Sequence, residues 1–227
     1  EMARSTGARV HICHATLPEV IDRVSRARRE ARVTVETCPH YLIFSEDDLE
    51  RLGGVLKCTP PVRTQESVEG LWDRVLNGAV DVISSDHSPS TVAQKNPASG
   101  SFWDMWGGAQ GVQTMLPALF THGVRRRGLS VEMLVRLVSE NPARLMGLYP
   151  RKGVIRIGSD ADLTILDPSA RWTLAPEMLL HKNKHSPYMG MKFEGRVTAT
   201  LVRGAVVFDG RKITADPGSG RLLRGSF

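Results

Sequence analysis

The stretch RVHICHATLPEVIDRV, residues 9–24, decides the fold, because a short strand in it runs directly into a helix. Residues 9–13 have the apolar alternation of a strand. The sequence TLPE at residues 16–19 then predicts a capping box with proline inside the first helical turn. The apolar residues that follow at helical spacing are Val20, Ile21, Val24 and Ala27.

This strand-and-helix pattern continues along the first part of the chain. Residues 33–38 predict a second strand, and Ser45 opens a short helix that Gly53 and Gly54 end. An apolar run at residues 55–58 ends at two prolines, and Gly78 ends the next helix. Residues 80–85, VDVISS, predict the last strand of this part. One face of the preceding helix carries Val68, Leu71, Trp72, Val75 and Leu76.

The pattern changes after a long polar loop at residues 86–106. Helices are predicted at residues 108–122 and 131–139, with a short one that Asn141 caps. Four strands with tight turns follow, at residues 154–157, 163–166, 171–174 and 197–208. We therefore expect β/α units with parallel strands over residues 1–148 and a small β module over residues 149–227. Residues 154–166 and 197–208 are expected to pair antiparallel, with Arg203 and Gly204 at a turn.

Composition excludes several classes of protein. The 227 residues are 41% hydrophobic and 24% charged, which is typical of a globular domain. No apolar run is long enough to span a membrane, and no secretory leader is visible. The net charge of +6 raises the possibility of nucleic-acid binding, but the basic residues lie on predicted helix faces without any nucleic-acid-binding signature. Three cysteines in apolar runs, Cys13, Cys38 and Cys58, predict buried reduced thiols in a cytoplasmic protein.

His14 and Asp86 are the first candidates for chemistry, because each follows a predicted parallel strand. In β/α barrels that end of the strands carries the active site. His11 and Cys13 share the opposite strand face from His14, so His11 and His14 are not expected to chelate one metal. His14 and Asp86 are able to reach a common centre from two strand tips. Taken singly, each residue is also typical of a structural role, as a hydrogen-bonded histidine or a turn-capping aspartate.

Several longer motifs resemble the cyclic-amide hydrolases of the amidohydrolase superfamily, and among them the allantoinase group. The motifs that carry the resemblance are VHICHAT, VETCPHYL, LKCTPPVR, SSDHSPS and FWDMWGGAQGVQ, at residues 10–16, 35–42, 56–63, 84–90 and 102–113. Two others, ENPARLMGL and KGVIRIGSDADLTILDP at residues 140–148 and 152–168, are typical of the whole superfamily. The resemblance implies the C-terminal part of a (β/α)8 barrel that holds metals, followed by a small β-sandwich module.

The resemblance also implies roles for individual residues. It makes His14 a metal ligand, and Asp86 both a metal ligand and the catalytic general base and acid. Two divalent metals, usually zinc, are implied, bridged by hydroxide and by a carboxylated lysine that these residues do not match. His40 is expected to support the site or the fold rather than to ligate. The implied substrate-contacting residues are Thr59, His87, Trp106 and Gly107.

Departures from the family narrow the expected activity. Ser90 and Thr59 stand where dihydroorotases carry other residues, which makes dihydroorotase activity less expected. The resemblance implies hydrolysis of allantoin to allantoate, in purine metabolism, by a homo-oligomeric enzyme. A hydantoinase, dihydropyrimidinase or dihydroorotase-like hydrolase is the alternative, and a metal-free binding scaffold is an alternative of another class. No His-x-His motif occurs in these residues, and a catalytic zinc normally takes three protein ligands. We therefore expect the C-terminal portion of a longer enzyme, inactive alone, without nucleic-acid or membrane partners.

Overall fold

The computed structural model describes Glu1–Ser226 and divides into two compact units. The first unit comprises Glu1–Met115 and Asn183–Met189, and the second comprises Leu116–Lys182 and the residues from Gly190 onward. The predicted boundary after residue 148, between barrel and β module, stays a prediction. No helix within residues 1–226 is both long enough and apolar enough to cross a bilayer.

The first unit is built on a parallel sheet of three short strands. β1 (Val10–Ile12) pairs with β2 (Val33–Thr37), and β2 pairs with β3 (Val82–Ile83), in the order β1-β2-β3. The three predicted strands are therefore confirmed in type and direction, although each is shorter than predicted. Since all three are parallel, their carboxyl ends lie along one edge of the sheet.

The α-helices of this unit are α1 (Met2–Thr6), α2 (Pro18–Ala27), α3 (Glu46–Leu52), α4 (Gln65–Leu76) and α5 (Val92–Lys95). The predicted capping box before α2 is wrong, because Leu17 is the N-cap residue and caps with no side chain. The Thr16 hydroxyl instead accepts a hydrogen bond from Arg63 Nε at 3.1 Å. The cap before α3 agrees with the prediction, since Ser45 and Asp48 form a reciprocal capping box.

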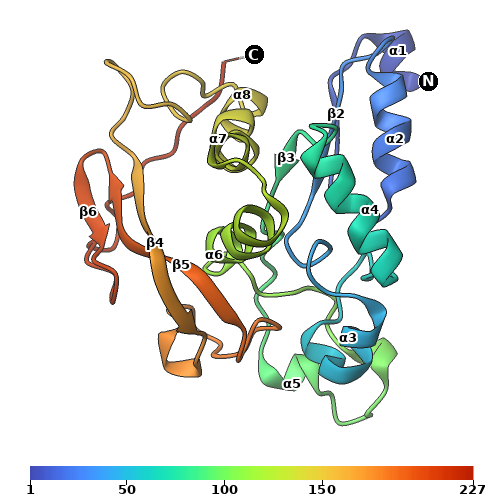
Figure 1. Ribbon diagram of the computed structural model, residues 1–227, viewed down its shortest axis with the longest axis vertical. Helices are drawn as coiled ribbons and strands as arrows, with labels where there is room; N and C mark the ends of the chain where they lie inside the picture. The colour runs from blue at the N-terminus through green and yellow to red at the C-terminus, as the bar shows by residue number, and fades with distance from the viewer. Residues whose placement is uncertain (227) are drawn as a thin grey trace. The chain divides into compact units, whose positions relative to one another are not determined.

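Helices α2 and α4 lie side by side in the first unit (Figure 1). Gly70 permits this approach, because a Cβ there would lie 2.6 Å from Pro18 Cγ. An ion pair spans the same two helices, with Arg74 Nη2 donating to Asp22 Oδ2 at 2.8 Å. The buried residues of α4 are Val68, Leu71, Trp72 and Val75, whereas Leu76 is exposed, contrary to the predicted face.

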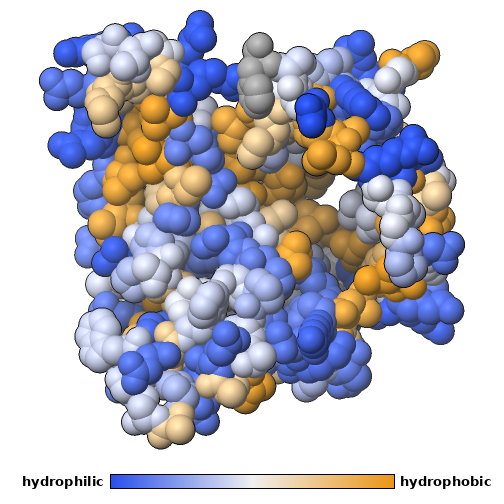
Figure 2. Space-filling model, turned by 180° about the vertical axis from the view of Figure 1, so that it is seen from behind, coloured by the Kyte–Doolittle hydropathy of each residue, from blue (hydrophilic) through white to orange (hydrophobic). Residues whose placement is uncertain are grey.

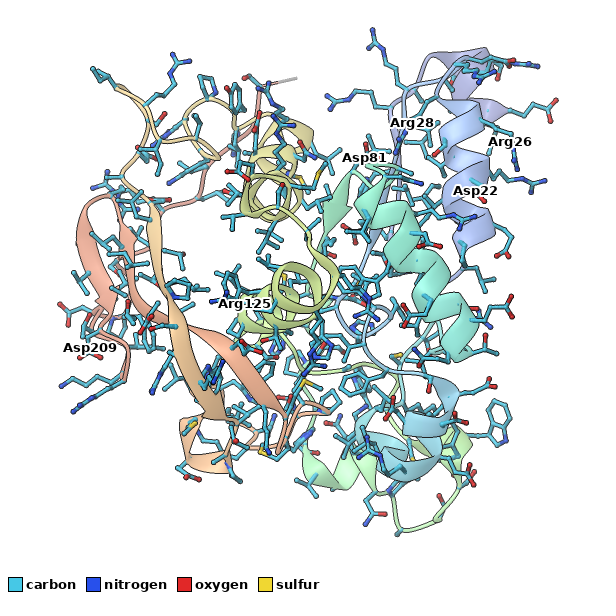
Figure 3. The ribbon with its side chains drawn as sticks, viewed as in Figure 1. Asp22, Arg26, Arg28, Asp81, Arg125 and Asp209 are labelled. Carbon is cyan, nitrogen blue, oxygen red and sulfur yellow. The ribbon has the colours of Figure 1, made fainter. Side chains whose placement is uncertain are left out.

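An ion pair also closes the end of the sheet where β3 begins. Arg28, just after α2, donates to Asp81 and to the Ala79 carbonyl, and Asp81 accepts from the Val35 amide at 2.8 Å. Arg28 and Asp81 lie next to each other at this end of the first unit (Figure 3). These contacts fix the amino-terminal ends of β2 and β3 and leave the carboxyl-terminal edge available for a site.

The helical part of the second unit consists of short segments. They are α6 (Met115–Leu119), a π-helix at Phe120–Arg125, α7 (Val131–Val135), a π-helix at Arg136–Glu140 and α8 (Asn141–Leu145). The helix predicted from residue 108 begins only at Met115. Asn141 lies inside α8 rather than capping it, because the preceding π-helix runs directly into α8.

The second unit also contains an antiparallel sheet, with β4 (Leu163–Thr173), β5 (Lys192–Val202) and β6 (Ala205–Phe208) in that order. Residues 163–166 and 171–174 were expected as two strands, but one strand with register shifts covers residues 163–173. Of the pairing predicted for residues 154–166, only residues 163–166 pair, antiparallel, with residues 197–201. Arg203 and Gly204 form the predicted turn between β5 and β6, with φ angles of 50° and 82°.

The predicted strand at residues 154–157 is wrong. Gly153 and Gly158 have positive φ angles on either side of this segment, which forms turns and bends instead. Ile155 and Ile157 are therefore largely exposed. Figure 2 shows hydrophobic residues as orange patches among polar ones on one face of the molecule.

Candidate metal centre

The carboxyl-terminal edge of the parallel sheet holds both predicted metal ligands. His14 follows β1 and Asp86 follows β3, and both have a left-handed backbone, with φ angles of 41° and 43°. Among residues 1–226, only Arg203 is a further non-glycine residue with positive φ. Such conformations cost about 1–3 kcal/mol each and gather at functional sites.

The backbone beside these two residues is fixed by β2. The Ala15 amide donates to the Glu36 carbonyl at 2.8 Å, and the Ser84 amide donates to the Thr37 carbonyl at 3.1 Å. The buried Thr37 hydroxyl donates to the Ala15 carbonyl at 2.8 Å. The residues that lead into and out of the two strained positions are therefore held on one rigid strand.

A group of possible metal ligands lies at this edge. Cys38, His40 and Asp86 each offer one ligand atom, and these atoms lie within 4.8 Å of one another. Cys38 and His40 are buried, whereas Asp86 is exposed. Sulfur, nitrogen and carboxylate oxygen are the donors that zinc takes in proteins, so the residues present fit a metal of this kind.

His40 is the most informative member of the group. Its side chain is 2% exposed, and Nε2 has no hydrogen-bond partner among the described residues. Burial, and to a smaller extent the charge of His14, lower the pKa of His40 to about 3. The imidazole is therefore neutral at ordinary pH, as a ligand must be.

The thiols of the first unit differ in exposure. Burial, followed by the charges of Asp86 and Glu36, raises the pKa of the Cys38 thiol. Cys58 is also buried, and burial raises its pKa. Cys13 is exposed, contrary to the expectation of three buried thiols, because the strand face that it shares with His11 is only partly covered. All three cysteines are free.

His11 belongs to a different group, in agreement with its predicted position on the opposite strand face from His14. His11 Nε2 lies 3.1 Å from Glu36 Oε2, and the Ser84 hydroxyl donates to Glu36 Oε1 at 2.8 Å. Cys13 completes a second set of possible ligands with His11 and Glu36. The strand alternation therefore gives this sheet two neighbouring polar groups, which the Ser84 hydroxyl links, because it also lies 3.9 Å from the Cys38 sulfur.

The predicted substrate-contacting residues include a close pair. A Cβ at Gly107 would lie 2.7 Å from Thr59 Oγ1, so only glycine permits this approach without a shift of Thr59. Trp106 Nε1 donates to the Ser88 hydroxyl at 3.0 Å, in the loop that follows Asp86. Thr59, Trp106 and Gly107 are all exposed, and therefore accessible to a small molecule.

Two lysines that sequence reasoning missed hold this loop. Lys57 Nζ donates to the carbonyls of Phe102, Trp103 and Met105, at 2.6, 3.1 and 2.7 Å. Lys95 is 4% exposed, and its Nζ donates to the carbonyls of Lys57 and Trp106, both at 2.9 Å. Burial lowers the pKa of Lys95 to about 8. The positions of Trp106 and Gly107 thus depend on these two ammonium groups.

His87 is held by the backbone of the same loop region. Its Nδ1 accepts hydrogen bonds from the amides of Gly111 and Val112, at 3.1 and 3.4 Å. Burial lowers its pKa, which favours the neutral ring. This nitrogen is occupied by the loop, and the predicted contact of His87 with substrate stays a prediction.

The structure thus brings Asp86 together with His40 and Cys38, and places His14 after β1 at the same edge of the sheet. Cys38 had been expected only as a buried thiol, although its position immediately after β2, two residues before His40, was a usable signal. Lys57 and Lys95 carried no signal in the sequence, because their partners are backbone carbonyls of a distant loop.

Comparison with known proteins identifies relatives of this chain. The chain is 39% identical to an allantoinase of Salmonella newport over 209 residues, which are 92% of this chain and 45% of that protein. It superimposes on the L-hydantoinase (dihydropyrimidinase) of Arthrobacter aurescens with a TM-score of 0.90 and 37% identity, over 95% of this chain and 48% of that one. For a D-hydantoinase of a Bacillus sp. AR9 the TM-score is 0.93 at 31% identity, over 98% of this chain and 50% of that one.

The chain therefore spans about half the length of these relatives. The sequence pattern of the Amidohydrolase family matches residues 1–207, which is most of the chain and includes every predicted ligand. This chain belongs to the amidohydrolase family.

Proposed function

We propose that this chain carries the carboxyl-terminal part of the active site of an enzyme that hydrolyses a cyclic amide, with allantoin as the substrate. The observation that carries the proposal is the pair of left-handed residues, His14 and Asp86, at one edge of the parallel sheet. The 39% identity to an allantoinase supports the choice of substrate. The likeness to hydantoinases supports the alternative of a hydantoin or dihydropyrimidine ring.

We propose His14 and Asp86 as metal ligands, with zinc as the metal. Bound divalent metals would supply an activated water and polarise the ring carbonyl. The remaining ligands are not among these 227 residues, since no His-x-His motif occurs in them. The fold that fits this proposal is part of a (β/α)8 barrel followed by a β-sandwich module.

Asp86 acts as general base and acid in this proposal. It takes a proton from the attacking water, whose oxygen bonds to the ring carbonyl carbon, and delivers that proton to the ring nitrogen as the C–N bond breaks. Exposure of Asp86 leaves its carboxylate free to reach both atoms. Thr59, Trp106 and Gly107 are proposed to orient the ring. Lys57 and Lys95 hold the loop that carries Trp106 and Gly107.

The cellular setting belongs to the same proposal. Three free thiols suit a reducing cytoplasm. Assembly into a homo-oligomer is proposed for the intact enzyme.

The proposal is tested by turnover of allantoin, hydantoin, dihydrouracil and dihydroorotate in protein that supplies the remaining ligands. Asp86→Asn should lose about 10²–10⁴-fold in kcat on the favoured ring, because an amide cannot take the proton. Asp47→Asn, an exposed aspartate on α3, is the control and should keep full activity. The 227 residues alone should show no turnover with added zinc. An Asp86→Asn variant with unchanged kcat contradicts the assignment.

A further inference from the structure

Cys38 and His40 form a pair of buried donors beside the proposed catalytic aspartate. The Cys38 side chain is fully buried and His40 is 2% exposed, yet neither has a strong partner. The Cys38 sulfur lies 3.9 Å from the Ser84 hydroxyl, a weak contact, and His40 Nε2 has none among residues 1–226. A buried nitrogen without a partner costs about 1–3 kcal/mol, so a ligand that uses it is favoured.

The position of the two residues explains why they face the same point. Cys38 comes directly after β2, and His40 lies in the turn that follows, where the Phe44 amide donates to the His40 carbonyl at 3.0 Å. The His40 ring packs on Tyr41 with centroids 4.1 Å apart, and the Tyr41 hydroxyl donates to the Pro60 carbonyl at 2.7 Å. These contacts hold the imidazole at the sheet edge without using Nε2.

The spacing of the three donors suits a single cation. The ligand atoms of Cys38, His40 and Asp86 lie within 4.8 Å of one another. Ligands on one tetrahedral cation, with bonds of about 2.0–2.3 Å, lie roughly 3.3–3.8 Å apart, so a side-chain movement of about 1 Å closes the set. Asp86 is exposed, which gives a cation a route from solvent to the buried pair.

The softness of the donors selects the kind of cation. Burial first, and then the charges of Asp86 and Glu36, raise the pKa of the Cys38 thiol, so the sulfur binds a cation by releasing its proton to solvent. A thiolate ligand selects soft metals such as Cd²⁺, or Zn²⁺, over Mg²⁺ and Ca²⁺. We infer that Cys38, His40 and Asp86 form a binding site for a thiophilic divalent cation, separate from the metal pair proposed for the reaction but sharing Asp86 with it.

Shared use of Asp86 has a consequence for activity, and this consequence rests on the proposed function. A cation held by Cys38 and His40 occupies the carboxylate that otherwise moves the proton. Thiophilic cations are therefore expected to inhibit turnover, whereas Mg²⁺ at the same concentration is not. Binding itself does not depend on the reaction, so the two proposals are tested separately.

The test is a titration of the 227-residue chain with Cd²⁺, followed by the ultraviolet absorption of the cadmium–thiolate bond. It is done in a Cys13→Ser background, which removes the exposed thiol and with it the second group of possible ligands. We expect saturation at one Cd²⁺ per chain, loss of the signal in Cys38→Ala, and an unchanged signal in Cys58→Ala. Cys58 is the matched control, because it is a second buried thiol outside the three-donor group.

Three results would overturn the site. They are no signal in the Cys13→Ser chain, a signal that persists in Cys38→Ala, and a signal that is lost in Cys58→Ala. If Cys38→Ala does not fold, Asp86→Asn replaces it as the test variant, since Asp86 is exposed. Loss of this ligand should weaken Cd²⁺ binding by about tenfold or more, and an unchanged affinity also overturns the site. An enzyme that fails to hydrolyse any of the four rings, with cadmium binding as expected, contradicts only the proposed function.

Discussion

His14 and Asp86 share a left-handed backbone conformation, although they follow different strands of one sheet. A side chain in this region costs about 1–2 kcal/mol relative to glycine. Neither residue is a glycine, so the sequence keeps a side chain where the backbone disfavours one. At both positions the side chain is of a kind that binds metals, and strained side chains gather at functional sites.

This relationship predicts an unusual order of stability. His14→Gly should be about 1 kcal/mol more stable than His14→Ala, because only glycine adopts the positive φ without strain. Asp86 should give the same order. The free energy of unfolding of the metal-free chain, from urea titrations, measures both pairs.

Asp73 is the control, since it is exposed inside helix α4. At position 73 the alanine variant should be the more stable one, because glycine in a helix interior destabilises a protein by about 1 kcal/mol relative to alanine. An alanine variant at position 14 that matches or exceeds the glycine variant shows that the backbone at His14 is not strained.

Much of the first unit could be predicted from the sequence, because its signals are local. Alternation located the three strands, and their common direction brings residues 14 and 86 to one edge. The start of α2 was misplaced because Thr16 bonds to Arg63, a partner 47 residues away that no local pattern reveals. The hydrogen bonds of Lys57 and Lys95 to the loop carbonyls could not be predicted for the same reason.

The second unit was harder to predict, because glycines decide its backbone. Residues 154–157 have the apolar content of a strand, but Gly153 and Gly158 turn the chain on either side. The turn at Arg203 and Gly204 was predictable, since it lies between two alternating runs that pair with each other.

The turn between β5 and β6 should be sensitive to substitution of its glycine. Gly204 has φ of 82°, so Gly204→Ala should destabilise the protein by about 1–2 kcal/mol. Gly220→Ala is the control, because Gly220 has an ordinary φ and open space around its Cα. Thermal unfolding of the two variants beside the unchanged chain checks the difference, and equal melting temperatures contradict it.

His122 should make stability depend on pH. Burial, with the charges of Arg126 and Arg127, lowers its pKa to about 4, from an ordinary value of 6.5. Below pH 6.5 the unfolded chain takes up a proton that the folded chain refuses, so stability is full above pH 6.5 and falls toward pH 4. The loss amounts to at most about 3 kcal/mol.

The measurement compares urea unfolding of the unchanged chain with that of His122→Gln at pH 7 and pH 4. Other titrating groups are common to both proteins and cancel in the difference. The variant should lose less stability on acidification, and an identical loss in both proteins assigns the pH dependence to other residues.

Lys95 should control the order of the loop that carries Trp106 and Gly107. Its ammonium makes two hydrogen bonds to backbone carbonyls, each worth about 1.5–3 kcal/mol for a charged donor. Lys95→Met keeps the aliphatic stem but removes both bonds, so amide exchange should rise at Trp106 and Gly108, whose amides donate to the carbonyls of Gln94 and Lys57. Exchange in helix α4 of the same variant is the internal control and should stay unchanged. Because the loop then no longer holds Gly107 against Thr59, the KM of the proposed reaction should rise more than kcat falls. Protection at Trp106 and Gly108 that equals that of the unchanged chain would show that other contacts hold the loop.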